Sequence, residues 1–176
     1  CVSNDTNAIW YFKADNPQRN KKNDVTKVEE TWWHQLISNT KGFSLEVNNA
    51  FSGATICYTG YSKGNQPRVP IAELSSHRDY TNDSWCGAPI GEYVYGNWTT
   101  EQLYYFRPAM AKLLYDLKGN YPTAQILFIL NSELKESINE SVHTICKHYG
   151  VQCLDLKDIE KQAGHPSVKG MTDISK

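Results

Sequence analysis

One histidine near the C-terminal end of the sequence is the first candidate for chemistry. His165 lies between Gly164 and Pro166 in the segment QAGHPSVKGM, residues 162–171. Pro166 restricts the backbone of the residue before it, and Ser167 can cap a helix that begins directly afterwards. Imidazole exchanges its proton near neutral pH, so a histidine held in this way can act as a general base. On the local sequence alone, a merely exposed histidine in a loop is the favoured alternative.

Two earlier segments offer groups that can stabilise negative charge on a reacting oxygen. Gly53 lies in NNAFSGAT, residues 48–55, just after a predicted strand. Because glycine has no side chain, its backbone N–H can closely approach an oxyanion. Asn82 in TNDSW, residues 81–85, carries a side-chain amide that can act as a second donor. Each segment alone is equally compatible with an ordinary turn.

The second half of the sequence has the pattern of a strand–helix–strand unit. The run AQILFILN, residues 124–131, is continuously apolar, as expected of a strand buried on both faces. Apolar residues then recur at helical spacing over 133–149, Gly150 can end that helix, and VQCLDL, residues 151–156, is the next strand. Such a connection requires parallel strands, so the predicted fold class is α/β.

Two helices and one strand are predicted before this unit. Residues 26–38 have a helical pattern with a capping box at their start, and FSLEVN, residues 43–48, alternates like a strand. A further helix is predicted over 100–120, with Thr99 as its cap. Pro108 should kink this helix or mark a break in it.

The predicted parallel sheet gathers polar residues at one edge. Ligands of such sheets bind beyond the carboxyl ends of the strands. Residues 131–133 follow one of these ends, residues 48–53 follow another, and His165 lies on the loop after the last strand. We therefore expect these three groups to open onto the same edge of the sheet.

Taken in this order, the segments NNAFSGAT, TNDSW and GHPSVKGM resemble the SGNH (GDSL-like) hydrolases, and within them the esterase-like members of gut Bacteroidetes. The segments WYFKADNPQ, VEETWWHQL, NDSWCGAPIGEY, YYFRPAMAKLL and ILNSELKESINESV extend the resemblance over most of the chain. The resemblance implies a single domain over residues 1–176, with three α/β/α layers and a flavodoxin-like parallel sheet of about five strands. It implies neither a metal nor an organic cofactor.

The resemblance also implies the reaction and the roles of the site residues. The expected reaction is ester hydrolysis through a serine acyl-enzyme, with His165 as base and then acid. The backbone of Gly53 and the side chain of Asn82 match the oxyanion donors of the family. The expected substrate is an acyl ester, above all an acetyl ester of a carbohydrate, and the alternative is a catalytically inactive relative that binds glycans. The family's tendency is a periplasmic or extracellular location.

The nucleophile of the family is absent from the sequence. No Gly-Asp-Ser segment occurs in the 176 residues, and the family would place it before Cys1. Residues 49–98 also contain no convincing core strand, and Tyr80 stands where the family has a glycine before the Asn82 turn. We therefore expect sequence to be missing before residue 1 and again between about residues 79 and 82.

The partner of the histidine also departs from the family pattern. Gln162 stands three residues before His165, where the family has an aspartate. A glutamine cannot supply an anion, although its carbonyl could still orient the ring. Glu133 and Asp158 are the possible substitutes, and Glu133 could instead bind a substrate hydroxyl. The alternative for Glu133 is a residue at the start of a helix, where the helix dipole favours it.

Composition limits the other functions. The net charge of -1 gives no basic footprint for nucleic acid or an anionic membrane, and no apolar run approaches the roughly 20 residues of a membrane span. The five cysteines contain no C-x-x-C pair, so neither a zinc site nor a disulfide framework is expected. Cys146 and Cys153 are predicted to be small buried side chains, and His143 and His148 to face solvent. The expected partner is a small-molecule or carbohydrate ester.

Overall fold

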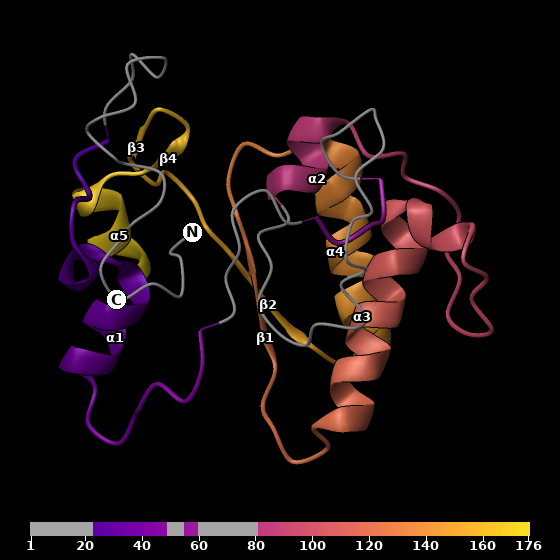
Figure 1. The fold of residues 1–176 in the computed structure, drawn as a ribbon, viewed down its shortest axis with the longest axis horizontal. Coiled ribbons are helices and arrows are strands. Elements are labelled where there is room, and N and C mark those ends of the chain that lie inside the picture. The colour runs from indigo at the N-terminus through magenta and orange to yellow at the C-terminus, as the bar shows by residue number, and fades with distance from the viewer. Residues whose placement is uncertain (1–22, 49–54, 60–80) are drawn as a thin grey trace. The chain divides into compact units, whose positions relative to one another are not determined.

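The computed structural model describes three stretches of the chain, residues 23–48, 55–59 and 81–176. They belong to two compact units, each described here by itself: unit 1 is Cys1–Ser52 with Lys157–Lys176, and unit 2 is Gly53–Leu156 (Figure 1). The single domain predicted over residues 1–176 stays a prediction. Among the described residues, no helix is long and apolar enough to cross a membrane.

Unit 2 contains the predicted strand–helix–strand unit. Strands β1 (Leu127–Leu130) and β2 (Gln152–Asp155) pair in parallel, and helix α4 (Glu136–Tyr149) connects them. Gly150 ends α4 in the left-handed conformation, with φ at 61°, which a glycine adopts without steric cost. The predicted α/β class with a parallel sheet is confirmed, and each element is shorter than its apolar pattern.

The core of unit 2 lies between the strands and two helices, α4 and α3 (Phe106–Asn120), which pack side by side (Figure 1). Ile138, Val142 and Ile145 form the buried stripe of α4 at the spacing that the sequence predicts. Other large buried members of this cluster are Ile56, Phe106, Met110, Leu114, Phe128 and Leu130. Burial of each such side chain contributes about 1.5–3 kcal/mol, so the cluster fixes the rotation of α4 against the sheet.

The helix predicted over residues 100–120 is divided in two. A short 3-10 turn, η4 (Gln102–Tyr104), precedes α3, and Tyr105 between them is extended. Pro108 falls in the first turn of α3, where its missing N–H removes no helical hydrogen bond. The Thr99 N–H donates to Gln102 Oε1 at 2.9 Å, and the Gln102 N–H donates to Thr99 Oγ1 at 3.4 Å. The predicted break is confirmed, and it lies at Tyr105, three residues before Pro108. The predicted cap at Thr99 is wrong, because the N-cap positions of η4 and α3 are Glu101 and Tyr105.

Unit 1 is built from short elements around a small core. They are η2 (Val28–Glu30), α1 (Trp32–Asn39), the antiparallel hairpin of β3 (Lys161–Gln162) and β4 (His165–Pro166), and α5 (Val168–Ile174). Val25 and Met171 are buried at its centre, with Trp32, Trp33 and Val168 packed against them. The predicted cap of α5 is confirmed, because Ser167 Oγ accepts from the Gly170 N–H at 3.1 Å.

The capping before η2 differs from the sequence prediction. The Glu30 carboxylate accepts from the Thr26 N–H at 2.7 Å and from the Lys27 N–H at 3.3 Å. The capping box therefore closes on Glu30, one residue later than the predicted Glu29. The reason is that the chain first makes the 3-10 turn and begins a regular helix only at Trp32.

The strand predicted over residues 43–48 is wrong. These residues form neither helix nor strand, and Phe43, Leu45 and Val47 are 62%, 47% and 52% exposed. The strand pairs of the described residues are β1 with β2 and β3 with β4. An alternating apolar pattern becomes a strand only when a partner satisfies its backbone groups, and no described strand pairs with this segment.

Candidate active site

A buried carboxylate joins the Asn82 segment to the residues that follow the Gly53 segment. Asp83 lies in α2 (Thr81–Cys86), a short helix that sequence analysis treats as a turn, and it is completely buried. Asp83 Oδ2 accepts from the Ile56 N–H at 2.7 Å, and Oδ1 accepts from the Cys57 N–H at 3.0 Å. The two carboxylate oxygens therefore hold Ile56 and Cys57 against α2, three and four positions after Gly53. Gly53 itself lies outside the described residues.

Burial and hydrogen bonding act in opposite directions on this carboxyl. Burial raises the pKa of Asp83 above its ordinary value and outweighs the backbone N–H groups of Cys57 and Ile56, which lower it. Burial, and next the charge of Asp83, raise the pKa of the Cys57 thiol to about 12. Cys57 therefore remains a neutral thiol at physiological pH and is unsuited to be a nucleophile.

Asn82 lies beside this anchor. It directly precedes Asp83 in α2 and is 5% exposed, so the fold removes its amide from bulk water. A buried amide makes stronger hydrogen bonds than one in water, which suits a group that is to stabilise an oxyanion. The oxyanion role of Asn82 stays a prediction.

The loop after β1 reaches the same helix. The Lys135 N–H donates to the buried Ser84 Oγ at 3.0 Å, which fastens the start of α4 to α2 (Figure 1). Within this loop Glu133 is exposed and has a φ of 64°, a conformation uncommon for a residue with a side chain. Backbone strain of this kind clusters at functional sites. Residues 56 and 57, which follow Gly53, and Lys135, which follows the loop after β1, thus both contact α2. The meeting of residues 48–53 with residues 131–133 stays a prediction.

His165 lies on the hairpin of unit 1. In the β3–β4 pair, Gln162 is directly opposite His165. Ala163 and Gly164 make the two-residue turn, with φ angles of 53° and 81°, as a type I′ turn requires. Side chains of directly opposite residues share one face of a hairpin, with Cβ atoms about 4.5–5.5 Å apart. The hairpin therefore keeps Gln162 beside the half-buried histidine.

Asn23 fastens the backbone around the histidine. Its two Nδ2 hydrogens serve three carbonyl oxygens, those of Gln162, His165 and Pro166, at 3.0, 3.2 and 3.1 Å. Its Oδ1 accepts from the Val25 N–H at 2.9 Å, and the residue is 6% exposed. Sequence analysis missed Asn23 because it stands in a polar stretch before the first helix, some 140 residues from its partners.

Asp24 forms hydrogen bonds with both the oxygen and the nitrogen of the Gln162 side-chain amide. The Asp24 N–H donates to Gln162 Oε1 at 2.9 Å, and Gln162 Nε2 donates to Asp24 Oδ2 at 3.3 Å. Asp24 Oδ1 also accepts from the Val168 N–H at 2.8 Å, at the start of α5. Gln162 thus connects the hairpin to Asp24. This contact brings the Asp24 carboxylate to the histidine loop, where the family's aspartate is replaced by Gln162. Whether the Gln162 carbonyl also orients the ring stays a prediction.

Glu133 and Asp158, the two predicted substitutes for the family's aspartate, belong to different units. Asp158 is exposed in unit 1, with a φ of 51°, and Glu133 is in unit 2. His165 belongs to unit 1, and Asn82 to unit 2. The roles of Glu133 and Asp158 stay predictions.

Comparison with known proteins gives one consistent result. A family model described as GDSL-like Lipase/Acylhydrolase matches residues 1–176. A crystal structure of a protein named as a candidate GDSL-like lipase from Bacteroides uniformis ATCC 8492 has a TM-score of 0.84 and 47% identity, covering 99% of this chain and 84% of that one. A similarly named protein from Bacteroides ovatus ATCC 8483 has a TM-score of 0.84 and 46% identity, with 99% and 86% covered. No curated protein matches the chain.

Proposed function

The chain belongs to the GDSL-like lipase/acylhydrolase family, and on that premise we propose that it is a serine ester hydrolase of SGNH type. The observation that carries the proposal is the meeting of three distant segments at α2. Asp83 anchors Ile56 and Cys57, Ser84 anchors the end of the loop after β1, and Asn82 lies next to both in α2. Anchors of this kind would hold the proposed donors, the Gly53 N–H and the Asn82 side chain, in fixed positions, as acyl transfer requires.

In the proposed reaction a serine hydroxyl attacks the carbonyl carbon of the ester while His165 takes the hydroxyl proton. The Gly53 N–H and the Asn82 side chain stabilise the oxyanion of the tetrahedral intermediate. The intermediate then expels the alcohol, to which His165 returns the proton. In the second half, water gives a proton to His165 and attacks the acyl group. The acid leaves and the serine regains its proton.

The nucleophilic serine needs direct identification, because no Gly-Asp-Ser segment occurs in the 176 residues. The test uses protein expressed from its complete coding sequence and treated with a fluorophosphonate probe, followed by peptide mapping. The proposal expects one labelled serine and loss of ester hydrolysis with labelling. Protein that remains unlabelled and does not hydrolyse p-nitrophenyl acetate would favour the alternative, an inactive relative that binds glycans.

For the substrate we propose an acetyl ester of a carbohydrate. Aromatic side chains in loops could form a platform that stacks on a sugar ring. Tyr93, Tyr95 and Trp98 pack against the core of unit 2, which favours a role in closing the edge of that core instead. Tyr95 also stacks on the His148 ring with centroids 3.7 Å apart. Trp85 differs, since it is 47% exposed and stands three residues after Asn82 in α2. An exposed indole face packs well on a pyranose ring.

Trp85→Ala separates the substrate proposal from the reaction proposal. It should raise KM for acetylated oligosaccharides several-fold and leave kcat/KM for p-nitrophenyl acetate near the wild-type value, because the small ester has no sugar ring to stack. Tyr115→Ala, at another exposed aromatic residue in α3, is the matched control. Equal effects of Trp85→Ala on both substrates would remove the argument for a sugar platform. A periplasmic or extracellular location is proposed on the same family grounds.

A further inference from the structure

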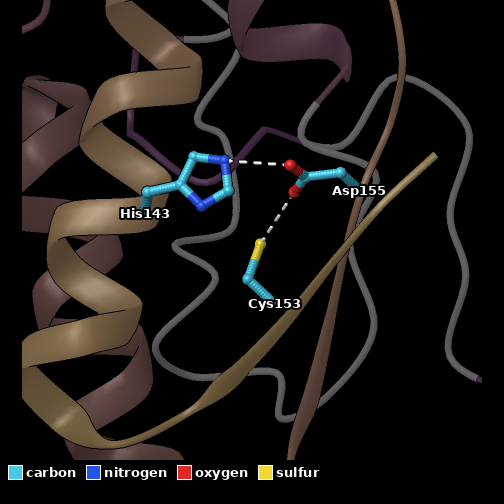
Figure 2. A group of neighbouring side chains, drawn as sticks. All are labelled: His143, Cys153 and Asp155. Atoms are coloured by element: carbon cyan, nitrogen blue, oxygen red, sulfur yellow. Dashed lines mark hydrogen bonds and ion pairs between the residues drawn. The ribbon is translucent and has the colours of Figure 1, made fainter. Parts of the chain in front are cut away.

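A second cluster of reactive side chains lies between α4 and β2. His143 on α4 faces Cys153 and Asp155 on β2 (Figure 2). His143 Nε2 is 3.3 Å from Asp155 Oδ2, and the Cys153 thiol donates to Asp155 Oδ1 at 3.6 Å. One ligand atom from each of the three residues lies within 4.8 Å of the other two. We propose that His143, Cys153 and Asp155 bind a zinc ion, independently of the ester site.

The donor set selects the class of ion. A thiolate, an imidazole and a carboxylate are the ligands that Zn²⁺ takes in proteins, whereas Mg²⁺ and Ca²⁺ prefer oxygen ligands alone. Three protein ligands leave a fourth tetrahedral position for water. The half-exposed side chains of His143 and Asp155, at 49% and 39%, leave that position access to solvent.

Two of the three separations between ligand atoms match tetrahedral coordination, and the third, between His143 and Cys153, is within 4.8 Å. With Zn–N near 2.05 Å, Zn–O near 2.1 Å and Zn–S near 2.3 Å, a tetrahedral angle separates nitrogen from oxygen by about 3.4 Å and sulfur from oxygen by about 3.6 Å. The corresponding contacts are 3.3 Å and 3.6 Å. They involve different oxygens of Asp155, so the carboxylate binds through both oxygens or turns slightly to present one.

The surrounding fold holds the three ligands in place before any ion binds. Cys153 and Asp155 are two positions apart on β2, so their side chains emerge on the same face of the strand. Their strand is paired with β1 along its whole length. On α4, His143 directly follows the completely buried Val142, which fixes the rotation of the helix. A pre-arranged site loses little conformational entropy on binding.

This cluster changes one expectation from the sequence. The absence of a C-x-x-C pair argues against local zinc motifs, but here the ligands come from a helix and a strand, with Cys153 and Asp155 ten and twelve residues after His143. His143 is exposed, as the sequence predicts, and it is also paired with Asp155. An ion bound here would cross-link α4 to β2 in the unit that carries the loop after β1.

Cobalt and zinc titrations test the site. Reduced, metal-free protein of the full chain should bind one Co²⁺ with a thiolate-to-cobalt charge-transfer band, and one equivalent of Zn²⁺ should displace it and raise Tm. Binding should release a proton as the Cys153 thiol becomes a thiolate. Cys153→Ser should abolish the charge-transfer band, and His143→Ala should weaken Zn²⁺ binding at least tenfold. His148→Ala, on the same helix outside the cluster, should bind as the wild type does.

Three results would overturn the proposal. The first is no stoichiometric binding of Co²⁺ or Zn²⁺. The second is an unchanged affinity in Cys153→Ser or His143→Ala, which would assign the ion to adventitious groups. The third concerns Cys146, whose thiol pKa is raised by a hydrogen bond with Cys153 and by burial. Loss of both thiols to a Cys146–Cys153 disulfide in the protein as isolated, seen by mass spectrometry, would leave no thiolate for the ion.

Discussion

Asp83→Asn tests whether one carboxylate holds the proposed oxyanion region together. Asparagine keeps the shape of the side chain but turns one acceptor oxygen into a donor, which then faces the N–H of Ile56 or Cys57. Losing a hydrogen bond to a charged group costs about 1.5–3 kcal/mol, and a buried unpaired donor costs about 1–3 kcal/mol. Removing the buried charge offsets part of this loss, because burial raises the pKa of Asp83. We expect the free energy of unfolding to fall by about 2–3 kcal/mol.

Urea unfolding at pH 7, followed by circular dichroism, measures this change. The matched control is Asp116→Asn on α3, where the carboxylate forms a partly exposed ion pair with Lys112. Breaking that pair should cost less than about 1 kcal/mol. An Asp83→Asn variant as stable as the wild type, or more stable, would refute the reasoning. It would mean that the cost of burying the charge cancels its two hydrogen bonds.

Three further predictions concern other parts of the chain. Burial raises the pKa of Cys57 from 9.0 to about 12, so the folded state favours the neutral thiol. The free energy of unfolding of the wild type, relative to that of Cys57→Ala, should therefore fall by about 1.4 kcal/mol per pH unit between pH 9 and pH 12, as measured by unfolding titrations. Asn23→Ala removes the donors that hold the histidine loop, so kcat for ester hydrolysis should fall about tenfold or more. The control Asn120→Ala, at the exposed end of α3, should leave kcat unchanged. A Cβ at Gly170 would clash with the backbone oxygen of Glu160, so thermal unfolding should show that Gly170→Ala loses about 1–3 kcal/mol of stability. A Cβ at Gly119 meets open space, so Gly119→Ala should be neutral or slightly stabilising.

Local patterns were sufficient to predict the central unit. The continuous apolar run ending at Leu130, the apolar stripe of Ile138, Val142 and Ile145, and the glycine at 150 each specify one element through burial or backbone geometry. Each of these signals is contained in a short stretch of neighbouring residues, so no long-range contact is needed to interpret it. The parallel pairing then follows from the length of the connection.

The anchors of the candidate site could not be predicted because they join distant parts of the chain. Asp83 was part of a segment treated as a turn, and its role depends on the backbone of residues 56 and 57. Asn23 acts on carbonyls that carry no side-chain signal. The apolar alternation over residues 43–48 was misleading for the opposite reason, because a period of two does not show whether a partner strand exists.

The most direct test of His165 as the catalytic base is steady-state hydrolysis of p-nitrophenyl acetate by protein expressed from its complete coding sequence. Removing the base should lower kcat of His165→Ala by a factor on the order of 10³ or more, with KM changed little, because the base acts in the transition state. His148→Ala, a histidine stacked on Tyr95 in α4, should keep the wild-type kcat. A His165→Ala variant that hydrolyses the ester at the wild-type rate would contradict the assignment.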